Sequence, residues 1–350
     1  MNNRLLLGLI LLLATISSTP ACALVILQYH HIATDTPRIT STRPEEFAAH
    51  MAYLQDEGFN IVSLSERLDP NAPRAGTISS REVAITFDDA YRSIYTEAFP
   101  RLKALGWPFT IFVASNLVSE HGGQYLTWAE LKEMQAQGAE IANHSTAHQH
   151  WARRPQSVSE SSWRAQFTED TLSAQAAINA HISQAPKHYA LPYGEYYPDL
   201  LEDLDDLGYL IFGQQSGAVP LPNHPLVIPR FPMGGPYAAM DGFKTKVNSL
   251  AFDRTVRIHN PVLSALETRP IANAAALGVT SVVGLNCFGP AGAIVPLQVG
   301  KGILIQSDEP LKAGRHRYNC TRRDDRTGRY QWHSFFWMKQ RPDNTWYPEP

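Results

Sequence analysis

Four residues in this 350-residue chain could together hold a metal and move a proton. Asp88 and Asp89 stand side by side at the end of an apolar run, and His144 and His148 follow a second apolar run. Adjacent carboxylates repel each other in a partly dry site, and a metal cation is the usual compensation. We therefore expect a divalent metal held by one carboxylate and two imidazoles, with the second carboxylate free to act as a base.

Such a ligand set indicates a catalytic metal site. One carboxylate and two imidazoles leave coordination positions open for water and substrate, which a structural site does not need. The donors suit zinc, and cobalt, nickel or manganese would also fit. The metal would lower the pKa of a bound water to about 7 and polarise a carbonyl oxygen. Asp88, if it is not a ligand, would accept the proton. The chemistry is that of a hydrolytic enzyme.

Short apolar runs alternate with helical patterns from residue 24 to about residue 231, and this alternation predicts the elements that position these groups. Predicted strands are 24–27, 59–62, 83–87, 108–113, 139–143, 187–191 and 209–212, and predicted helices are 44–57, 91–105, 127–137, 158–182 and 198–207. About seven βα units favour a distorted (β/α) barrel of parallel strands, an α/β fold with its active face at the carboxyl ends of the strands. His30, Asp88, His144 and Tyr193 all follow such strands, so we expect them on one rim.

Two motifs resemble those of the NodB-type polysaccharide deacetylases, also called carbohydrate esterase family 4. Residues 86–89 match the family's Thr-Phe-Asp-Asp motif, with Ala90 in place of the glycine that usually follows, and residues 144–148 match its His-Ser/Thr-x-x-His motif. The resemblance covers roughly residues 24–255. It implies that the general base is Asp88 and that the metal ligands are Asp89, His144 and His148.

The third family motif, Arg-x-Pro-Tyr/Phe-Gly, is matched only in part. The family arginine, which orients the base, is Ala190 here, so we expect Asp88 to lack that partner. The resemblance implies that Pro192 and Tyr193 line the substrate groove and that the Tyr193 N–H helps to bind the oxyanion. This substitution, with the Tyr-His-His sequence at residues 29–31, resembles the branch that acts on poly-β-1,6-N-acetylglucosamine.

Three further residue roles stay open. His30 lies either near the metal and substrate or in a structural position. The family's late Leu-x-His motif, which commonly supplies the general acid, has no clean match, and neither His224 nor His259 can be assigned to that role. Arg230 follows a later strand and contacts either the substrate or a carboxylate.

These features predict a metal-dependent enzyme that hydrolyses acetamide groups of an N-acetylated polysaccharide containing N-acetylglucosamine and releases acetate. One alternative is a peptidoglycan or chitin deacetylase, or an O-acetyl esterase, on the same fold. A second alternative is a carbohydrate-binding protein with weakened catalysis, which the missing arginine and the unassigned acid support.

The composition and the N-terminus bear on partners and location. The formal net charge of −3 offers no basic stripe for nucleic-acid phosphates. Arg4, an apolar run at 5–13 and the small residues at 21–23 follow the order of a secretory signal, and the run is too short for a membrane span. We expect a signal peptide over residues 1–23, no transmembrane segment after its removal, and a periplasmic or secreted protein. Lipid anchoring at Cys22 is the less favoured alternative.

The sequence changes character in its last part. Short apolar runs between glycines and prolines predict a small antiparallel β-rich domain over residues 256–350. Cys287 and Cys320 remain after signal removal, and an even pair in an exported chain indicates a disulfide. Aromatic residues here form either the core of this domain or a sugar-binding face: Trp332, Phe335, Phe336, Trp337 and Trp346.

Overall fold

The computed structural model describes residues 23–70, 72, 81–118, 123–256 and 259–349. The predicted signal peptide lies outside these described residues except for Ala23. Among the described residues, no helix is both long and apolar enough to cross a membrane.

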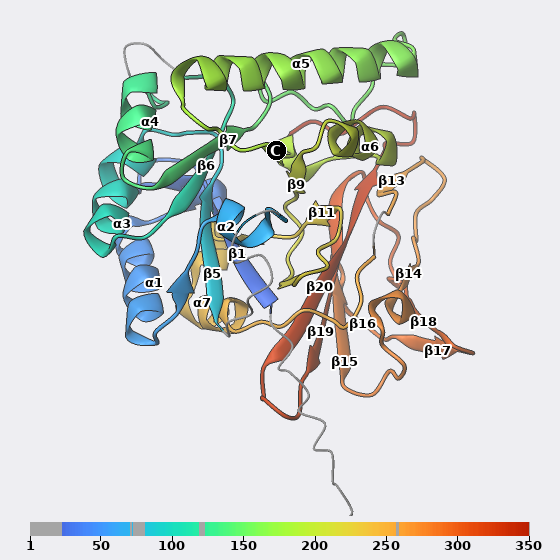
Figure 1. Ribbon diagram of the computed structural model, residues 1–350. Coiled ribbons are helices and arrows are strands. Elements are labelled where there is room, and N and C mark those ends of the chain that lie inside the picture. The colour runs from blue at the N-terminus through green and yellow to red at the C-terminus, as the bar shows by residue number, and fades with distance from the viewer. Residues whose placement is uncertain (1–22, 71, 73–80, 119–122, 257–258, 350) are drawn as a thin grey trace, which may run out of the picture.

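A nearly closed sheet of mostly parallel strands forms the first part of the chain (Figure 1). Its order is β10-β1-β5-β6-β7-β8-β9-β11, with β12 beside β1 and β4 beside β5. Only β10 runs antiparallel to its neighbour. Because β11 and β12 follow each other closely and β12 pairs with β1, the sheet curves back on itself. The strands are β1 (Ala23–Tyr29), β4 (Asn60–Ile61), β5 (Glu82–Phe87), β6 (Phe109–Val113), β7 (Ala139–Asn143), β8 (His188–Ala190), β9 (Leu210–Phe212), β10 (Val219–Pro220), β11 (Val227–Ile228) and β12 (Phe231–Pro232). The predicted distorted barrel is confirmed.

Helices lie around the outside of this barrel (Figure 1). They are α1 (Pro44–Asp56), α2 (Leu64–Leu68), the π-helix η2 (Ile94–Ala98), α3 (Phe99–Leu105), α4 (Trp128–Gln135), α5 (Glu160–His181), α6 (Pro198–Asp206) and α7 (Met240–Val247). The hydroxyls of Thr127 and Ser159 accept backbone N–H groups at the starts of α4 and α5. The helix predicted over 91–105 is divided into η2 and α3. Pro100 lies at this junction and has no N–H to continue a regular α-helical ladder.

Alternation along the strands decides which side chains reach the site. Leu24 and Ile26 of β1 and Ala84 of β5 belong to the cluster inside the barrel. With a period of two, Gln28 and Thr86 continue the same inward faces, and β1 and β5 pair in register at these two positions. The inward face therefore changes from apolar to polar at the carboxyl end of the barrel, where the carboxylate after β5 lies.

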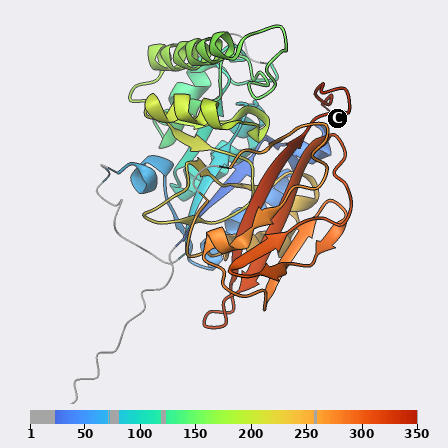
Figure 2. The same cartoon turned by 90° about the vertical axis from the view of Figure 1, so that its right-hand side faces the viewer.

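The C-terminal β region (residues 262–349) packs against one side of the barrel (Figure 2). One sheet has the order β13-β20-β19-β15-β16 and a smaller one the order β14-β18-β17. Their strands are β13 (Val262–Leu263), β14 (Ala272–Asn273), β15 (Leu285–Gly289), β16 (Gly292–Ile294), β17 (Leu297–Val299), β18 (Gly302–Ile305), β19 (Gly314–Arg323) and β20 (Tyr330–Lys339). All pairs are antiparallel except β13 with β20. The domain boundary at residue 256 stays a prediction.

The aromatic residues of β20 divide between the core of the C-terminal β region and its interface with the barrel. Phe335, Phe336 and Trp337 are buried. Phe336 packs in one cluster with Tyr196 and other barrel residues, while Trp332 meets Phe231 edge to face at 5.2 Å. These rings therefore act as core rather than as an open sugar-binding face.

A disulfide between Cys287 and Cys320 confirms the predicted pairing. The two residues lie opposite each other on β15 and β19, and both are buried in the core of the C-terminal β region. The bond therefore cross-links the longest hairpin to its neighbouring strand.

Replacing both cysteines with alanine should lower the free energy of unfolding by about 3–4 kcal/mol, because the bond closes a loop of 33 residues in the unfolded chain. Urea unfolding followed by intrinsic tryptophan fluorescence would measure the change. Dithiothreitol should lower the midpoint of the wild type and leave that of Cys287→Ala/Cys320→Ala unchanged. An equal response of both proteins to the reductant would contradict a stabilising bond.

Candidate active site

The turn after β5 separates the two adjacent carboxylates. Asp88 is fully buried, and its N–H donates to the Tyr29 carbonyl at 2.9 Å, which ties the ends of β5 and β1 together. Asp89 and Ala90 then adopt left-handed φ angles of 68° and 55°. Ala90 takes this conformation although its Cβ disfavours it, so the surroundings must hold the turn. As a result the two carboxylates have different partners.

Asp88 faces a buried cation. Arg230, between β11 and β12, forms a bidentate pair with it: Nη1 lies 2.7 Å from Oδ1 and Nη2 lies 2.8 Å from Oδ2. Gln28 Nε2 donates to the same Oδ2 at 2.6 Å. Burial alone would raise the pKa of Asp88, but the Arg230 guanidinium and nearby His144 lower it to about 2. Asp88 is therefore a carboxylate at neutral pH.

This pair corrects the expectation that Asp88 lacks an arginine. Ala190 indeed has no guanidinium, but Arg230 comes to Asp88 from a different strand end. Arg230 has no exposed surface, and its Nε also donates to the Gly213 carbonyl at 2.9 Å. Of the two contacts proposed for Arg230, the structure shows the one with a carboxylate and places the side chain away from a substrate surface.

Asp89 faces two imidazoles. The Nε2 atoms of His144 and His148 each lie 3.3 Å from Asp89 Oδ1. Ligand atoms of the three residues lie within 4.8 Å of one another, as a single ion would require. Burial alone would raise the pKa of Asp89, but the surrounding imidazoles hold it well below its usual range.

The donor set fits a divalent metal. His144 Nδ1 lies 2.7 Å from the Ala190 carbonyl. In the tautomer with a proton on Nδ1, this nitrogen donates to the carbonyl and leaves Nε2 free to face Asp89. A metal-ligating histidine is usually held by such a bond. Asp89 Oδ1 and His144 Nε2 are buried atoms without a hydrogen-bond partner among the described residues. A cation between them would satisfy both atoms.

The pKa shifts of the two histidines also suit a cation. Burial lowers the pKa of His148 to about 4, so its ring is neutral at neutral pH, as a ligand must be. Burial opposes charge on His144 as well, but Asp89 and Asp88 raise its pKa above its usual value. The carboxylates thus favour a positive charge at this position.

The segment between the two histidines is a turn rather than part of a helix. Ser145 and His148 have left-handed φ angles of 68° and 55°. The Ser145 N–H donates to the Asn143 side chain at 2.9 Å, and the His148 N–H donates to the Ser145 hydroxyl at 2.8 Å. Asp170 of α5 accepts the Thr146 N–H and hydroxyl. These local bonds hold His148 opposite Asp89.

The Pro192–Gly194 turn, η3, brings Tyr193 to the same rim. Tyr193 has a left-handed φ of 59°, and its ring centroid lies 4.3 Å from that of His148. Among the described residues, its N–H has no backbone acceptor, whereas the N–H groups of Gly194 and Glu195 donate within the turn. Pro192 is buried at the start of the turn.

His30 lies beside the buried carboxylate of Asp88. Its Nε2 is 4.0 Å from Asp88 Oδ2, and its side chain is 16% exposed, in contrast to the fully buried Asp88. The next residue, His31, is instead stacked on Tyr91 at 3.5 Å and is buried. Of the two positions weighed for His30, the structure favours the one near the reacting groups.

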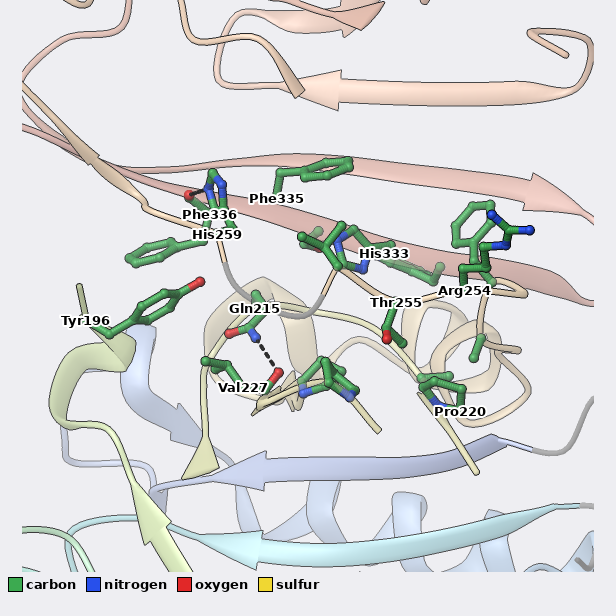
Figure 3. A pocket seen from close by; sticks show the side chains of 18 residues that line it. Tyr196, Gln215, Pro220, Val227, Arg254, Thr255, His259, His333, Phe335 and Phe336 are labelled. Atoms are coloured by element: carbon green, nitrogen blue, oxygen red, sulfur yellow. Dashed lines mark hydrogen bonds between the residues drawn. The ribbon is translucent and has the colours of Figure 1, made fainter. Parts of the chain in front are cut away.

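The other histidines considered for the acid lie elsewhere. His224 Nδ1 faces the Pro225 carbonyl at 3.1 Å. His259 Nε2 lies 2.8 Å from the Phe336 carbonyl, in a pocket between the barrel and β20 (Figure 3). Among the described residues that line this pocket there is no aspartate or glutamate, and burial lowers the pKa of its His333 to about 4. Its chemistry does not resemble that of the carboxylate pair.

Sequence reasoning missed two contributors to the rim. Gln28 was detectable, because it is a polar residue within the apolar run of β1. Glu195 follows the third motif directly and is buried, but its arginine partners Arg153 and Arg315 are distant in sequence and have no motif of their own. Pairing of this kind appears only after folding.

Comparisons with known proteins agree with this site. Residues 75–212 match the polysaccharide deacetylase family. The Bacillus subtilis protein YxkH is 32% identical over 136 residues, which cover 39% of this chain and 47% of that protein. The poly-beta-1,6-N-acetyl-D-glucosamine N-deacetylase of Escherichia coli is 22% identical over 236 residues, covering 57% of this chain and 35% of that enzyme. The chain thus spans less than half the length of these two relatives.

A solved structure shows the same fold. IcaB from Ammonifex degensii aligns with a TM-score of 0.53 and 26% identity, over 65% of this chain and 96% of that one. The resemblance inferred from the motifs is thereby confirmed. Asp88, Asp89, His144 and His148 all lie inside the segment of this chain that matches the polysaccharide deacetylase family.

Proposed function

We propose that the protein is a metal-dependent N-deacetylase of a polysaccharide that contains N-acetylglucosamine. The observation that carries the proposal is that the two adjacent carboxylates have different partners. Asp89 converges with two imidazoles on one point, whereas Asp88 is held apart from them by Arg230. Such a separation supplies a cation site and a base next to each other, as hydrolysis of an unactivated amide requires.

The ligands are Asp89, His144 and His148, and a divalent metal bound there, zinc or else cobalt, nickel or manganese, would polarise the acetamide carbonyl and acidify a water. Asp88 accepts the proton of the attacking water. A carboxylate has about four acceptor sites. Gln28 and the two Arg230 nitrogens occupy three on Asp88, which leaves room for one more donor.

Two further groups complete the reaction in this proposal. The Tyr193 N–H, which has no backbone acceptor among the described residues, donates to the oxyanion of the tetrahedral intermediate. His30 protonates the leaving amine, because among the structurally described histidines left without a role it is the one beside the base and partly exposed. The amide carbon–nitrogen bond then breaks and releases acetate and a free amine.

The proposed polymer follows from the named relatives and from the positions at which this chain differs from the general family motifs. A relative is named as acting on poly-beta-1,6-N-acetyl-D-glucosamine, and residues 29–31 and Ala190 match the pattern of that branch. Peptidoglycan, chitin and O-acetyl groups are the alternative substrates for the same set of residues.

The buried Asp88–Arg230 pair weakens the main argument for a carbohydrate-binding protein with reduced catalysis, which was the missing arginine. An exported location, periplasmic or secreted, is proposed from residues 1–23 alone.

Residues 24–350 purified with zinc should release acetate from β-1,6-linked N-acetylglucosamine oligomers faster than from β-1,4-linked ones. Asp88→Asn should lower kcat by at least about 100-fold, since it removes the base while nearly keeping its shape. Enzymatic detection of acetate measures both. Activity that survives chelation and Asp88→Asn would overturn the mechanism, and saturable sugar binding without turnover would favour the binding protein.

Metal binding can be tested separately from turnover. His148→Ala should weaken zinc affinity by at least about 100-fold in calorimetric titration, because it removes one of three protein ligands. His30→Ala is the matched control and should change that affinity by less than about threefold, since the proposal places His30 beside Asp88 rather than at the metal. Equal losses in the two variants would contradict this ligand set.

Arg230→Met should move the acidic limb of kcat/KM to higher pH. Without the guanidinium, burial dominates and raises the pKa of Asp88 above its usual 3.8, and the base works only when deprotonated. The unpaired buried carboxylate should also cost about 3–5 kcal/mol of stability. Arg230→Lys retains a cation and should shift the limb less. A pH–rate profile identical to the wild type would show that Arg230 does not control the base.

A further inference from the structure

A second charged cluster lies next to the catalytic rim and is centred on Glu195, which is 2% exposed. Arg153 Nη2 donates to Glu195 Oε1 at 2.6 Å, and Arg315 Nη1 does so at 3.1 Å. The Tyr347 hydroxyl donates to the same oxygen at 2.9 Å, and His150 Nδ1 lies 3.0 Å from Oε2. Burial would raise the pKa of Glu195, but His150, Arg153 and Arg315 lower it to about 2.

This Glu195 cluster joins the two parts of the chain. Glu195, His150 and Arg153 follow barrel strands, whereas Arg315, on β19, and Tyr347 belong to the C-terminal β region. A further carboxylate, Glu349, accepts from Arg315 Nη2 at 2.6 Å and from Arg153 Nη2 at 2.5 Å. Figure 1 shows the segment after β20 returning to the barrel near β9 and α6. The barrel rim is therefore bonded to residues outside the matched family segment.

The cluster is not a second metal site, although His150, Glu195 and Glu349 place ligand atoms within 4.8 Å of one another. Two guanidiniums already neutralise the two carboxylates. A divalent cation among them would meet two like charges at close range. The arrangement is that of a structural ion-pair network.

The network acts on the loop that carries Tyr193. Tyr193 and Gly194 have consecutive left-handed φ angles of 59° and 67°, and Glu195 follows directly. A Cβ at Gly194 would lie 2.7 Å from Gln214 Cβ, so the loop fits tightly there. A non-glycine residue adopts this conformation at an energetic cost and keeps it only where its surroundings impose it. The bonds of Glu195 supply that restraint at one end of the turn.

The side chain of Tyr193 is restrained from the same direction. Its ring is stacked on His150 at 3.6 Å and 12°, and the Arg315 guanidinium lies 5.4 Å from the ring centroid. Its other neighbour is His148, at 4.3 Å. A continuous set of contacts thus runs from β19 through Tyr193 to a residue of the proposed metal site.

We propose that Arg315 and Tyr347 are positioning residues, through which the C-terminal β region holds the Tyr193 N–H where the oxyanion forms. This inference rests on the proposed deacetylase function. Neither residue needs to touch the substrate. Their effect on the reaction passes through Glu195 and the turn, so it concerns the chemical step more than substrate binding.

The test compares full-length Arg315→Ala and Tyr347→Phe with Arg323→Ala, an exposed arginine at the other end of β19. Arg315→Ala should lower kcat about 10-fold with KM changed less than about twofold, since a misplaced donor weakens only transition-state binding. Tyr347→Phe, which removes one hydroxyl, should have a smaller effect in the same direction. Arg323→Ala should match the wild type.

Hydrogen exchange gives a readout that does not depend on turnover. The N–H groups of Gly194 and Glu195 should exchange about 10-fold faster in Arg315→Ala, while β5 and β7 keep their protection. Unchanged exchange, or faster exchange with an unchanged kcat, would overturn the inference, as would a rise in KM alone. If the wild type releases no acetate from any substrate, the proposed function fails, and the exchange data still decide whether β19 orders the turn.

Discussion

The site depends on the burial of Asp88. A carboxylate removed from water is unstable unless it is paired, and breaking such a pair costs about 3–5 kcal/mol. Arg230 provides both nitrogens of its fork, Gln28 adds a third donor, and Thr86 bonds to the same guanidinium at 3.2 Å. Because these groups come from β1, from β5 and from the segment after β11, the barrel must curve nearly closed for the base to be ionised. The closure of the barrel and the ionisation of Asp88 thus depend on each other.

That constraint explains why adjacent carboxylates can do different work. Asp88 points into the barrel interior and Asp89 does not, and the left-handed turn at Asp89 and Ala90 makes this divergence possible. Similar left-handed positions occur at His148 and Tyr193 on the neighbouring strand ends. Left-handed backbone positions thus occur at the strand ends where the side chains of the site must be aimed.

Much of this arrangement was predictable from the sequence, and the remainder has an identifiable reason. Apolar runs with helical patterns between them predicted the barrel, because periodicity is a local property. The placement of Asp88, Asp89, His144 and His148 on one rim followed, since parallel strands place their carboxyl ends together. The partner of Asp88 was missed because Arg230 lies 142 residues away and no motif links them. The contacts of Glu195 with Arg315 were missed for the same reason, and so was the turn between the histidines, whose shape depends on Asp170 of α5.

The bond between Arg230 and Asp88 also links the segment that matches the family to a residue outside it. The family match ends at residue 212, and it contains the carboxylate pair and both imidazoles. It does not contain the cation that keeps Asp88 charged. A fragment cut at the limits of the match would carry the carboxylate pair and both imidazoles and yet lack the guanidinium that pairs with Asp88. In this chain, the site therefore needs residues that lie beyond the end of the family match.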